Sequence, residues 1–382
     1  MARTLFIFAG EPSGDMHGAM LVRALREREP DIRLAGVGSH RMREAGVDVY
    51  HDLTSLAAIG ILEVAKVMFK VRKVWVQMVA RLDSERPDAV VLIDYPMFNL
   101  RIAREAHARG IPVIYYVTPQ FWAWRRGRAH RIARYVDLSL CVFPFEPEFF
   151  ARYGAKAKFI GHPLLDILAG YDHDRRRAAD FGLPDSKIIL GLLPGSRHSE
   201  IKHLLKKLLR AAELIDHDLG GISVAVAPAP LFSREDYESW QQLTRLPLHF
   251  FPGRAYDVMA GSDLLLVASG TATLEAGIIG TPMIVTYTLS WMSILIAPVV
   301  CRFIKYYSLV NLVAGHELVP EIMGWHSRPE NIARKAVSLV REAGLQATSR
   351  TLKAELRRKL GEPGAAGRAA DEILALLATR PP

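Results

Sequence analysis

Residues 263–277 read DLLLVASGTATLEAG, and this stretch decides the fold prediction. Residues 264–267 form an unbroken apolar run of strand length, which is typical of a strand covered on both faces. Ser269 and Gly270 interrupt the run, and a helical pattern of apolar residues follows. A strand, a tight turn and a helix start point unpaired backbone N–H groups at one place. That place favours an anion, because the helix dipole is positive there.

The residues of this turn suit the parts of a nucleotide. Gly270 lets a phosphate approach the backbone closely, and Thr271 or Thr273 can cap the helix. Glu275 lies roughly one helical turn further on, where a carboxylate could bind two neighbouring ribose hydroxyls. Taken alone, a motif this short also fits an ordinary buried joint between strand and helix.

The composition suggests two domains and an acidic partner. The chain has 382 residues, of which 50% are apolar, enough for two cores of ordinary size. Its formal net charge of +9 suits a nucleotide, a phosphorylated substrate, an anionic membrane or a nucleic acid. Nucleic acid is disfavoured, because the arginines do not belong to a base-reading motif.

The cysteines and the apolar runs predict a cytoplasmic protein. Cys141 and Cys301 lie in apolar runs without metal-type spacing, which indicates free thiols in a reducing compartment. The apolar residues 5–9 are too few for a signal peptide, since Gly10 and Glu11 follow directly. No run reaches the roughly 20 apolar residues of a membrane span.

The first half of the chain reads as alternating strands and helices with polar loops between them. Residues 5–9 form a strand, residues 10–15 a polar turn and residues 16–28 an amphipathic helix. The turn lies at the carboxyl end of its strand, where open α/β sheets bind ligands. It lacks the G-x-G-x-x-G pattern, so a dinucleotide is not favoured.

Asp94 is the candidate base of this half. It follows the buried strand 89–93 and precedes Tyr95 and Phe98, so its carboxylate faces the ligand-binding edge beside aromatic rings. Partial desolvation there would make it a plausible proton acceptor. A helix N-cap aspartate is the alternative.

Two further segments allow a structural and a functional interpretation. Residues 118–126 follow the strand 113–117 and hold two tryptophans beside arginines, so they indicate either a positive binding patch or a solvated helix face.

Residues 59–82 are apolar nearly all round with interleaved basic residues. They indicate either a buried core helix or a surface helix at an anionic bilayer.

A second α/β half begins after residues 161–163, which read GHP and mark a crossing between domains. The strand 188–193 is followed by the loop 194–200, a second strand–turn–helix anion site. Arg197 is placed there to neutralise a phosphate through a forked hydrogen bond. A salt-bridged surface arginine is the alternative.

Taken together, these motifs resemble the lipid-A-disaccharide synthase family over nearly the whole chain. The matching segments are residues 10–15, Asp94 with Phe98 and Asn99, and residues 119–125, 159–163, 193–197, 269–275 and 311–315.

The resemblance implies the α/β GT-B fold, with two Rossmann-like domains facing a central cleft. The expected domains are residues 1–163 on the acceptor and membrane side and residues 164–345 for the UDP-sugar. Residues 346–382 are expected to form helices that pack back on the first domain or exchange between two subunits in a homodimer.

The resemblance also implies the reaction. A 2,3-diacylglucosamine unit passes from its UDP derivative to 2,3-diacylglucosamine 1-phosphate with inversion, which gives a β(1→6) disaccharide and UDP. No metal or cofactor is expected. Acylated substrates imply a peripheral enzyme on the inner face of the inner membrane. Another UDP-sugar enzyme of this fold is the alternative: a transferase for a polyprenyl acceptor, or a UDP-N-acetylglucosamine 2-epimerase.

Site residues follow from the same resemblance, motif by motif. Asp94 matches the general base, and Arg197 and Asn311 match residues needed for activity. The UDP site is expected at Gly195, Ser196, Arg197, Ser269, Gly270, Thr271, Glu275 and Asn311. The acceptor side is expected at Glu11, Ser13, Gly14, Asp15, Gln120, Trp122 and Arg125.

Two positions depart from the family pattern. In the motif that begins with Asp94, the family usually has a second aspartate where this chain has Met97. This change leaves the expected base, Asp94, unaffected. Thr288 stands where the family usually has Arg or Lys, which removes a positive charge. The second change is expected to alter donor affinity or acyl-chain choice.

Overall fold

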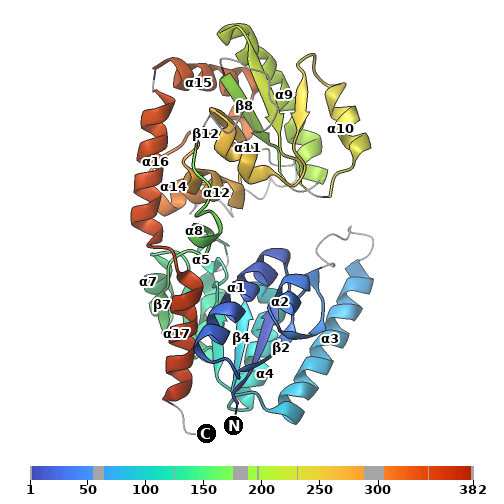
Figure 1. Cartoon of the computed structure of the whole chain (residues 1–382), viewed down its shortest axis with the longest axis vertical. Helices are drawn as coiled ribbons and strands as arrows, with labels where there is room; N and C mark the ends of the chain where they lie inside the picture. The colour runs from blue at the N-terminus through green and yellow to red at the C-terminus, as the bar shows by residue number, and fades with distance from the viewer. Residues whose placement is uncertain are drawn as a thin grey trace. The chain divides into compact units, whose positions relative to one another are not determined.

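The computed structural model of the chain consists of two α/β units (Figure 1). It describes residues 2–54, 64–124, 126–174, 188–195, 198–229, 231–287, 305–342 and 344–379. Unit 1 comprises Met1–Asp166 and Gly361–Pro382, and unit 2 comprises Ile167–Leu360.

A parallel seven-stranded sheet forms the centre of unit 1, in the order β3-β2-β1-β4-β5-β6-β7. Alternate side chains of each strand point to opposite faces, and both faces are covered. In β1, Leu5 and Ile7 join one core while Phe6 and Phe8 join the other. The strands are β1 (Thr4–Ala9), β2 (Arg33–Val37), β3 (Asp48–His51), β4 (Ala89–Ile93), β5 (Val113–Tyr116), β6 (Leu138–Cys141) and β7 (Ala157–Phe159).

Helices cover both faces of this sheet. The helices α1 (Pro12–Arg28) and α17 (Ala365–Ala378) contribute to the core of one face. The other face is covered mainly by α3 (Val64–Glu85), α4 (Pro96–Ala108) and α6 (Ala129–Tyr135). Shorter helices lie in the loops: α2 (His40–Glu44), α5 (Phe121–Trp124), η3 (Arg126–Arg128) and α7 (Glu146–Ala151). The chain then enters α8 (Leu164–Ile167), where unit 1 ends and unit 2 begins.

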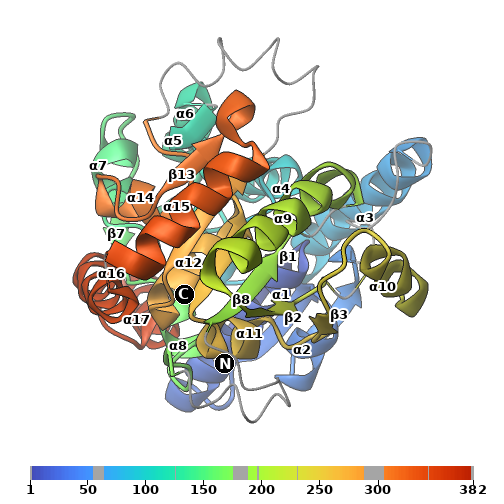
Figure 2. The same cartoon turned by 90° about the horizontal axis from the view of Figure 1, so that it is seen from above.

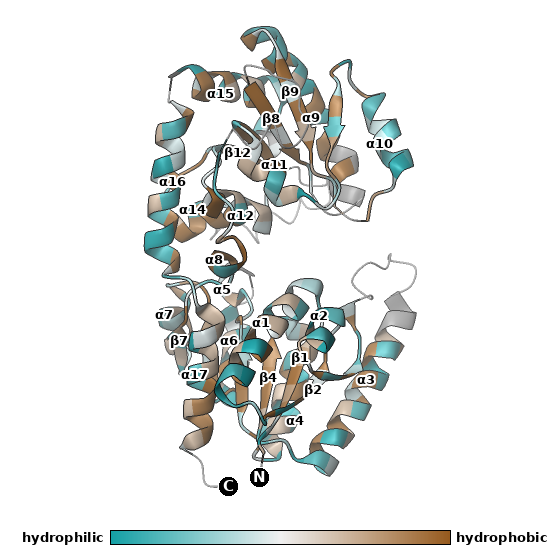
Figure 3. Ribbon diagram, in the orientation of Figure 1, coloured by the Kyte–Doolittle hydropathy of each residue, from teal (hydrophilic) through white to brown (hydrophobic). Residues whose placement is uncertain are grey.

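Unit 2 repeats this plan with six parallel strands in the order β10-β9-β8-β11-β12-β13. The apolar run predicted as a strand at residues 264–267 lies in β11, and every residue of that strand is buried. Figure 3 shows the apolar strands in the interior of each unit. The strands are β8 (Ile188–Leu193), β9 (Ile222–Val226), β10 (Leu248–Phe250), β11 (Leu264–Ala268), β12 (Met283–Tyr287) and β13 (Glu321–Met323).

The helices of unit 2 also form two layers. On one face, α9 (His198–Leu219) and α15 (Pro329–Glu342) lie side by side and share a core with the strands (Figure 2). On the other face, α12 (Thr271–Ile279) packs against its neighbours α11 (Ala255–Gly261), α14 (Leu309–Ala314) and α16 (Leu345–Leu360). The remaining elements are α10 (Arg234–Gln241) and η5 (Gly324–His326).

The two last helices belong to different units. Helix α16 stays on unit 2, where a Cβ at Gly277 would come within 2.5 Å of the Leu356 side chain. Helix α17 packs along α1 of unit 1, and Arg28 pairs there with Asp371. Residues 346–382 were expected to form one returning segment, whereas the structure divides them at Gly361.

Both sheets have the strand order of a Rossmann fold, and in each the order reverses between two neighbouring strands. The reversal lies between β1 and β4 in unit 1 and between β8 and β11 in unit 2. The loops that follow these strands diverge to opposite sides, and the crevice they leave is where such sheets bind ligands.

Candidate active site

In unit 1, the loops after β1 and β4 meet at the point of strand reversal. A Cβ at Gly10 would lie 2.2 Å from a ring carbon of Tyr95. The Tyr95 ring therefore lies directly on the Gly10 backbone, and a side chain at position 10 would displace the ring. Position 10 requires glycine because the ring approaches its backbone so closely.

The backbone at this edge is strained. Asp94 and Tyr95 both have a φ of 45°, and Val117 after β5 has a φ of 58°. Such values are unfavourable for residues other than glycine and gather at functional sites. Asn99 helps to hold the turn, because its Nδ2 donates to the Asp94 carbonyl at 2.7 Å. The Tyr115 hydroxyl donates to the same carbonyl at 2.6 Å.

The carboxyl group of Asp94 is mostly buried at this edge. Burial raises the pKa of Asp94 to about 6, and the nearby charge of Glu11 adds to the rise. The N-cap of α4 is Tyr95, not Asp94, so the structure does not support the alternative interpretation as a capping aspartate. A carboxylate with this pKa can accept a proton near neutral pH.

The loop after β1 contains the other predicted acceptor residues. Glu11 precedes α1 and is half-buried, whereas Ser13 is exposed and Gly14 is buried. Asp15 is buried and accepts hydrogen bonds from the backbone N–H groups of Ser39 at 2.6 Å, Arg41 at 3.1 Å and Met42 at 3.3 Å. Asp15 therefore holds the start of α2. The neighbouring cavity has a volume of about 340 Å³ and is lined by Pro12, Ser13, Asp15, Met16, Ser39, His40, Arg41 and Thr54.

The loop after β5 brings an indole to the same edge. Gln120 is exposed, and Trp122 is half-buried, with its Nε1 donating to Glu146 Oε1 at 3.1 Å. Arg125 lies outside the described residues. Sequence reasoning missed Glu146, although it is an acidic residue amid the aromatic run FPFEPEFF directly after a strand.

In unit 2, the described part of the predicted nucleotide site centres on the turn from β11 to α12. The Ser269 hydroxyl donates to the Tyr307 carbonyl at 2.9 Å, which fixes the turn. Gly270 is the N-cap of α12 and has no heavy atom within 4 Å of where a Cβ would stand. Thr271 is exposed as the first helical residue. The start of α12 therefore faces open space and can receive an anion.

Glu275 lies one turn into the same helix. Its Oε1 accepts a hydrogen bond from the Tyr256 hydroxyl at 3.2 Å, and burial raises its pKa. The Tyr256 ring packs edge-on against Tyr171.

The loop after β8 is described only as far as Gly195, whose φ of 115° places it in the left-handed region. Ser196 and Arg197 lie outside the described residues, and so does Thr288. Their predicted roles remain predictions.

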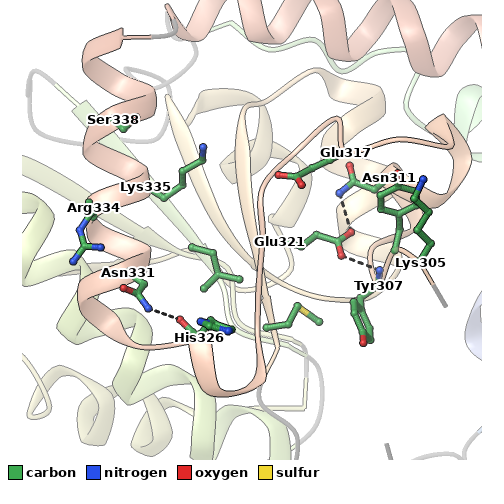
Figure 4. Close-up of a pocket in the computed structure, with 13 residues that line it drawn as sticks. Lys305, Tyr307, Asn311, Glu317, Glu321, His326, Asn331, Arg334, Lys335 and Ser338 are labelled. Carbon is green, nitrogen blue, oxygen red and sulfur yellow. Dashed lines mark hydrogen bonds between the residues drawn. The ribbon is translucent and has the colours of Figure 1, made fainter. Parts of the chain in front are cut away.

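Asn311 is held by hydrogen bonds within the protein. It is fully buried, its Nδ2 donates to the Val319 carbonyl and to Glu321 Oε1, both at 2.8 Å, and its Oδ1 accepts from the N–H groups of Leu318 and Val319. Figure 4 shows Glu321 between Asn311 and Tyr307. The side chain thus joins α14 to the strand β13, and its hydrogen-bonding capacity is used within the protein.

Glu321 was not among the predicted site residues. It also accepts from the Tyr307 and Ser308 N–H groups, both at 2.9 Å, and so anchors the start of α14. The cavity of about 720 Å³ beside it is basic on its α15 side, where Arg334 and Lys335 lie (Figure 4).

Comparison with known proteins assigns the family. The family model described as lipid-A-disaccharide synthetase matches residues 5–374. The chain is 37% identical over 381 residues to the lipid-A-disaccharide synthase of Syntrophus aciditrophicus, with 98% of each chain covered. It is also 37% identical to that of Myxococcus xanthus, over 98% of this chain and 97% of the relative.

The chain belongs to the lipid-A-disaccharide synthase family. It is therefore a glycosyltransferase of lipid A biosynthesis that takes a sugar-nucleotide donor.

Solved structures show the same fold at low sequence identity. The S. aureus MnaA–UDP co-structure aligns with a TM-score of 0.66 at 15% identity, covering 100% of this chain and 99% of that one. The calicheamicin glycosyltransferase CalG4 aligns with a TM-score of 0.59 at 15% identity, covering 100% of both chains. The GT-B prediction is confirmed, with two Rossmann-like domains.

Within each unit, the structure places predicted site residues at the point of strand reversal. Glu11 and Asp94 follow β1 and β4, and Gly195 and Ser269 follow β8 and β11. Met97, the departure on α4, is 62% exposed.

Proposed function

We propose that the protein transfers 2,3-diacylglucosamine from its UDP derivative to 2,3-diacylglucosamine 1-phosphate, with inversion and without a metal. The products are the β(1→6) lipid A disaccharide and UDP. The observation that carries this proposal is Asp94, a strained, mostly buried carboxylate at the point of strand reversal in unit 1, with a pKa raised to about 6.

Asp94 acts as the general base. The acceptor hydroxyl must lose a proton as it attacks the anomeric carbon, and a base is most effective when its pKa is near the working pH. Direct attack from the face opposite the leaving UDP inverts the anomeric centre. The rigid turn around Asp94 keeps the carboxylate in place for this step.

The start of α12 binds the diphosphate of the donor. Gly270 leaves room for close approach, and the first N–H groups of the helix carry the partial positive charge that an anion needs. These donors, together with Arg197, stabilise the charge that develops on the leaving group. Glu275 binds the ribose, with Tyr256 holding one of its oxygens.

Asn311 acts as a positioning residue in this proposal. Its buried side chain joins α14 to β13, and Ser308, the N-cap of α14, lies directly after Tyr307, which receives the hydrogen bond from Ser269. Loss of Asn311 would therefore loosen the turn that holds the diphosphate.

The substrates carry acyl chains, and α3 supplies a surface that suits a membrane. Val74, Met78 and Leu82 are buried against the sheet, while Met68 and Phe69 are 66% and 72% exposed. Lys70, Arg72 and Lys73 are exposed on the same helix. An apolar surface with basic neighbours suits an anionic interface, and we place the enzyme peripherally on the inner face of the inner membrane. In the part of the chain that the structure describes, no helix is long and apolar enough to cross a membrane.

The reaction itself provides the test. The protein is incubated with both acylated sugars and EDTA, and UDP release is measured. We expect UDP to form only when donor and acceptor are both present. UDP release that requires an added divalent metal would contradict metal independence, and no release in any detergent would exclude the proposed reaction.

The rival is an epimerase, because the fold is shared with UDP-N-acetylglucosamine 2-epimerases. An epimerase needs no acceptor and no lipid surface. Conversion of UDP-N-acetylglucosamine without an acceptor would support it.

A further inference from the structure

Glu146 is a buried carboxylate that the proposed mechanism does not use. It is the first residue of α7 and is 0% exposed. Burying a carboxylate is costly unless hydrogen bonds compensate for the lost water. Here the compensation comes from three N–H donors on two different loops.

The two oxygens of Glu146 hold different parts of the protein. Oε2 accepts from the backbone N–H groups of Val142 at 3.1 Å and Phe143 at 3.0 Å, directly after β6. Oε1 accepts from the Trp122 indole at 3.1 Å, after β5. The carboxylate therefore ties the indole to the end of the neighbouring strand.

The indole is also held by aromatic contacts. The Trp122 ring packs edge-on against Phe145 and Phe143, with ring centroids 5.1 and 6.1 Å away. These three rings form an apolar wall at the carboxyl edge of the sheet. The loop that carries Trp122 begins beside Asp94, because β5 is paired with β4 and Asp94 N–H donates to the Val117 carbonyl.

We propose that Glu146 is a positioning residue that fixes the Trp122 indole as an apolar wall for the acylated sugar acceptor, next to the base. The proposal rests on the proposed function, since it assigns a surface to the acceptor of that reaction. An aromatic ring held in one orientation can cover the apolar face of a sugar or the start of an acyl chain at little cost in entropy.

Glu146→Gln tests the link between the two loops. A glutamine has only one oxygen, so it cannot accept from the backbone pair and from the indole at once. If its oxygen keeps the backbone pair, its NH₂ group faces the indole N–H and Trp122 is released. Glu148→Gln is the matched control, because Glu148 lies on the same helix and its exposed side chain pairs with Arg152.

The readouts separate positioning from general stability. We expect Glu146→Gln to raise the acceptor KM on the order of tenfold, with donor KM and kcat little changed, as for loss of uniform binding. Trp122→Phe should do the same, and the double variant should add nothing further. In the ¹⁵N spectrum, the indole resonance that disappears in Trp122→Phe should shift in Glu146→Gln and stay in place in Glu148→Gln.

Two results would overturn the proposal. One is an unchanged acceptor KM in Trp122→Phe. This variant keeps Glu146 and its backbone donors, so it remains informative if Glu146→Gln fails to fold. The other is a rise confined to the donor KM. The indole resonance is measured without substrate. It therefore tests the Glu146–Trp122 contact even if the protein does not catalyse the proposed reaction.

Discussion

At the scale of single residues, Asp94 carries the chemistry that we propose. Replacing it with Asn keeps the shape of the side chain but removes the proton acceptor. We expect turnover of Asp94→Asn to fall by roughly 10²–10⁴-fold, the usual contribution of a general base. UDP binding, measured by calorimetry, should survive. Unchanged turnover would reject the assignment.

The raised pKa of Asp94 also predicts a pH dependence of stability. The folded-state pKa of about 6 lies above the ordinary 3.8, so folding disfavours the charged form. The Asp94 carboxyl group therefore contributes most to the free energy of unfolding below pH 3.8, and this contribution is lost as the pH rises through about 6. Relative to Asp94→Asn, the wild type should lose up to about 3 kcal/mol of unfolding free energy across this window, measured by urea unfolding. A constant difference between the two proteins would contradict the raised pKa.

Gly10 supports the same site through close packing. A Cβ in Gly10→Ala would displace the Tyr95 ring, which adjoins the strained Asp94 backbone. We expect kcat to drop with a loss of stability of about 1–3 kcal/mol, typical of overpacking. Gly170→Ala is the control, because no atom lies within 4 Å of its Cβ position. Equal kinetics in both variants would show that Tyr95 does not support the base.

At the scale of secondary-structure elements, α3 shows what the sequence left open. Its residues are apolar nearly all round, so periodicity could not separate a buried helix from a membrane-facing one. In the structure, Val74, Met78 and Leu82 of this helix pack on the sheet, whereas Met68, Phe69 and Val76 are exposed.

The exposed part of α3 predicts membrane binding. Reversing the charge of Lys70 and Lys73 should weaken binding to vesicles that contain anionic lipid by at least roughly thirtyfold, since each basic residue near such a surface contributes about 1 kcal/mol. Replacing Met68 and Phe69 with Ser should weaken binding to neutral vesicles as well. Lys206→Glu with Lys335→Glu, both exposed on unit 2, is the matched control. Equal loss in the control would indicate a general charge effect.

At the scale of the whole molecule, the chain crosses from unit 2 back to unit 1 through its last helix. Helix α17 buries Ala369, Ala370 and Ile373 in the core of unit 1, and Arg28 pairs with Asp371. This arrangement predicts a crosslink within one chain. With cysteines at positions 28 and 371, a short bifunctional reagent should give a product of monomer mass in denaturing gels. A product of dimer mass would show instead that α17 is exchanged between two subunits.

Much of the fold could be predicted from local sequence. The apolar strand runs and the small-residue turns after them indicated two parallel α/β halves, because strand burial and turn geometry depend on a few neighbouring residues. Asp94, Gly270 and Glu275 could be selected for the same reason, because each lies in the turn after such a strand or in the first turns of the next helix.

Other features depended on contacts between distant residues. Glu146 reads as an exposed residue at a helix start, and only the packing of Trp122 and the ends of β5 and β6 around it buries it completely. Asn311 could be selected from its motif, but the motif does not reveal its hydrogen-bond partners Leu318 and Val319. The sequence by itself determined the strands, the turns and the family. The tertiary structure decided which polar groups are buried and what they hold, because burial and hydrogen bonding of a loop residue are set by segments far along the chain.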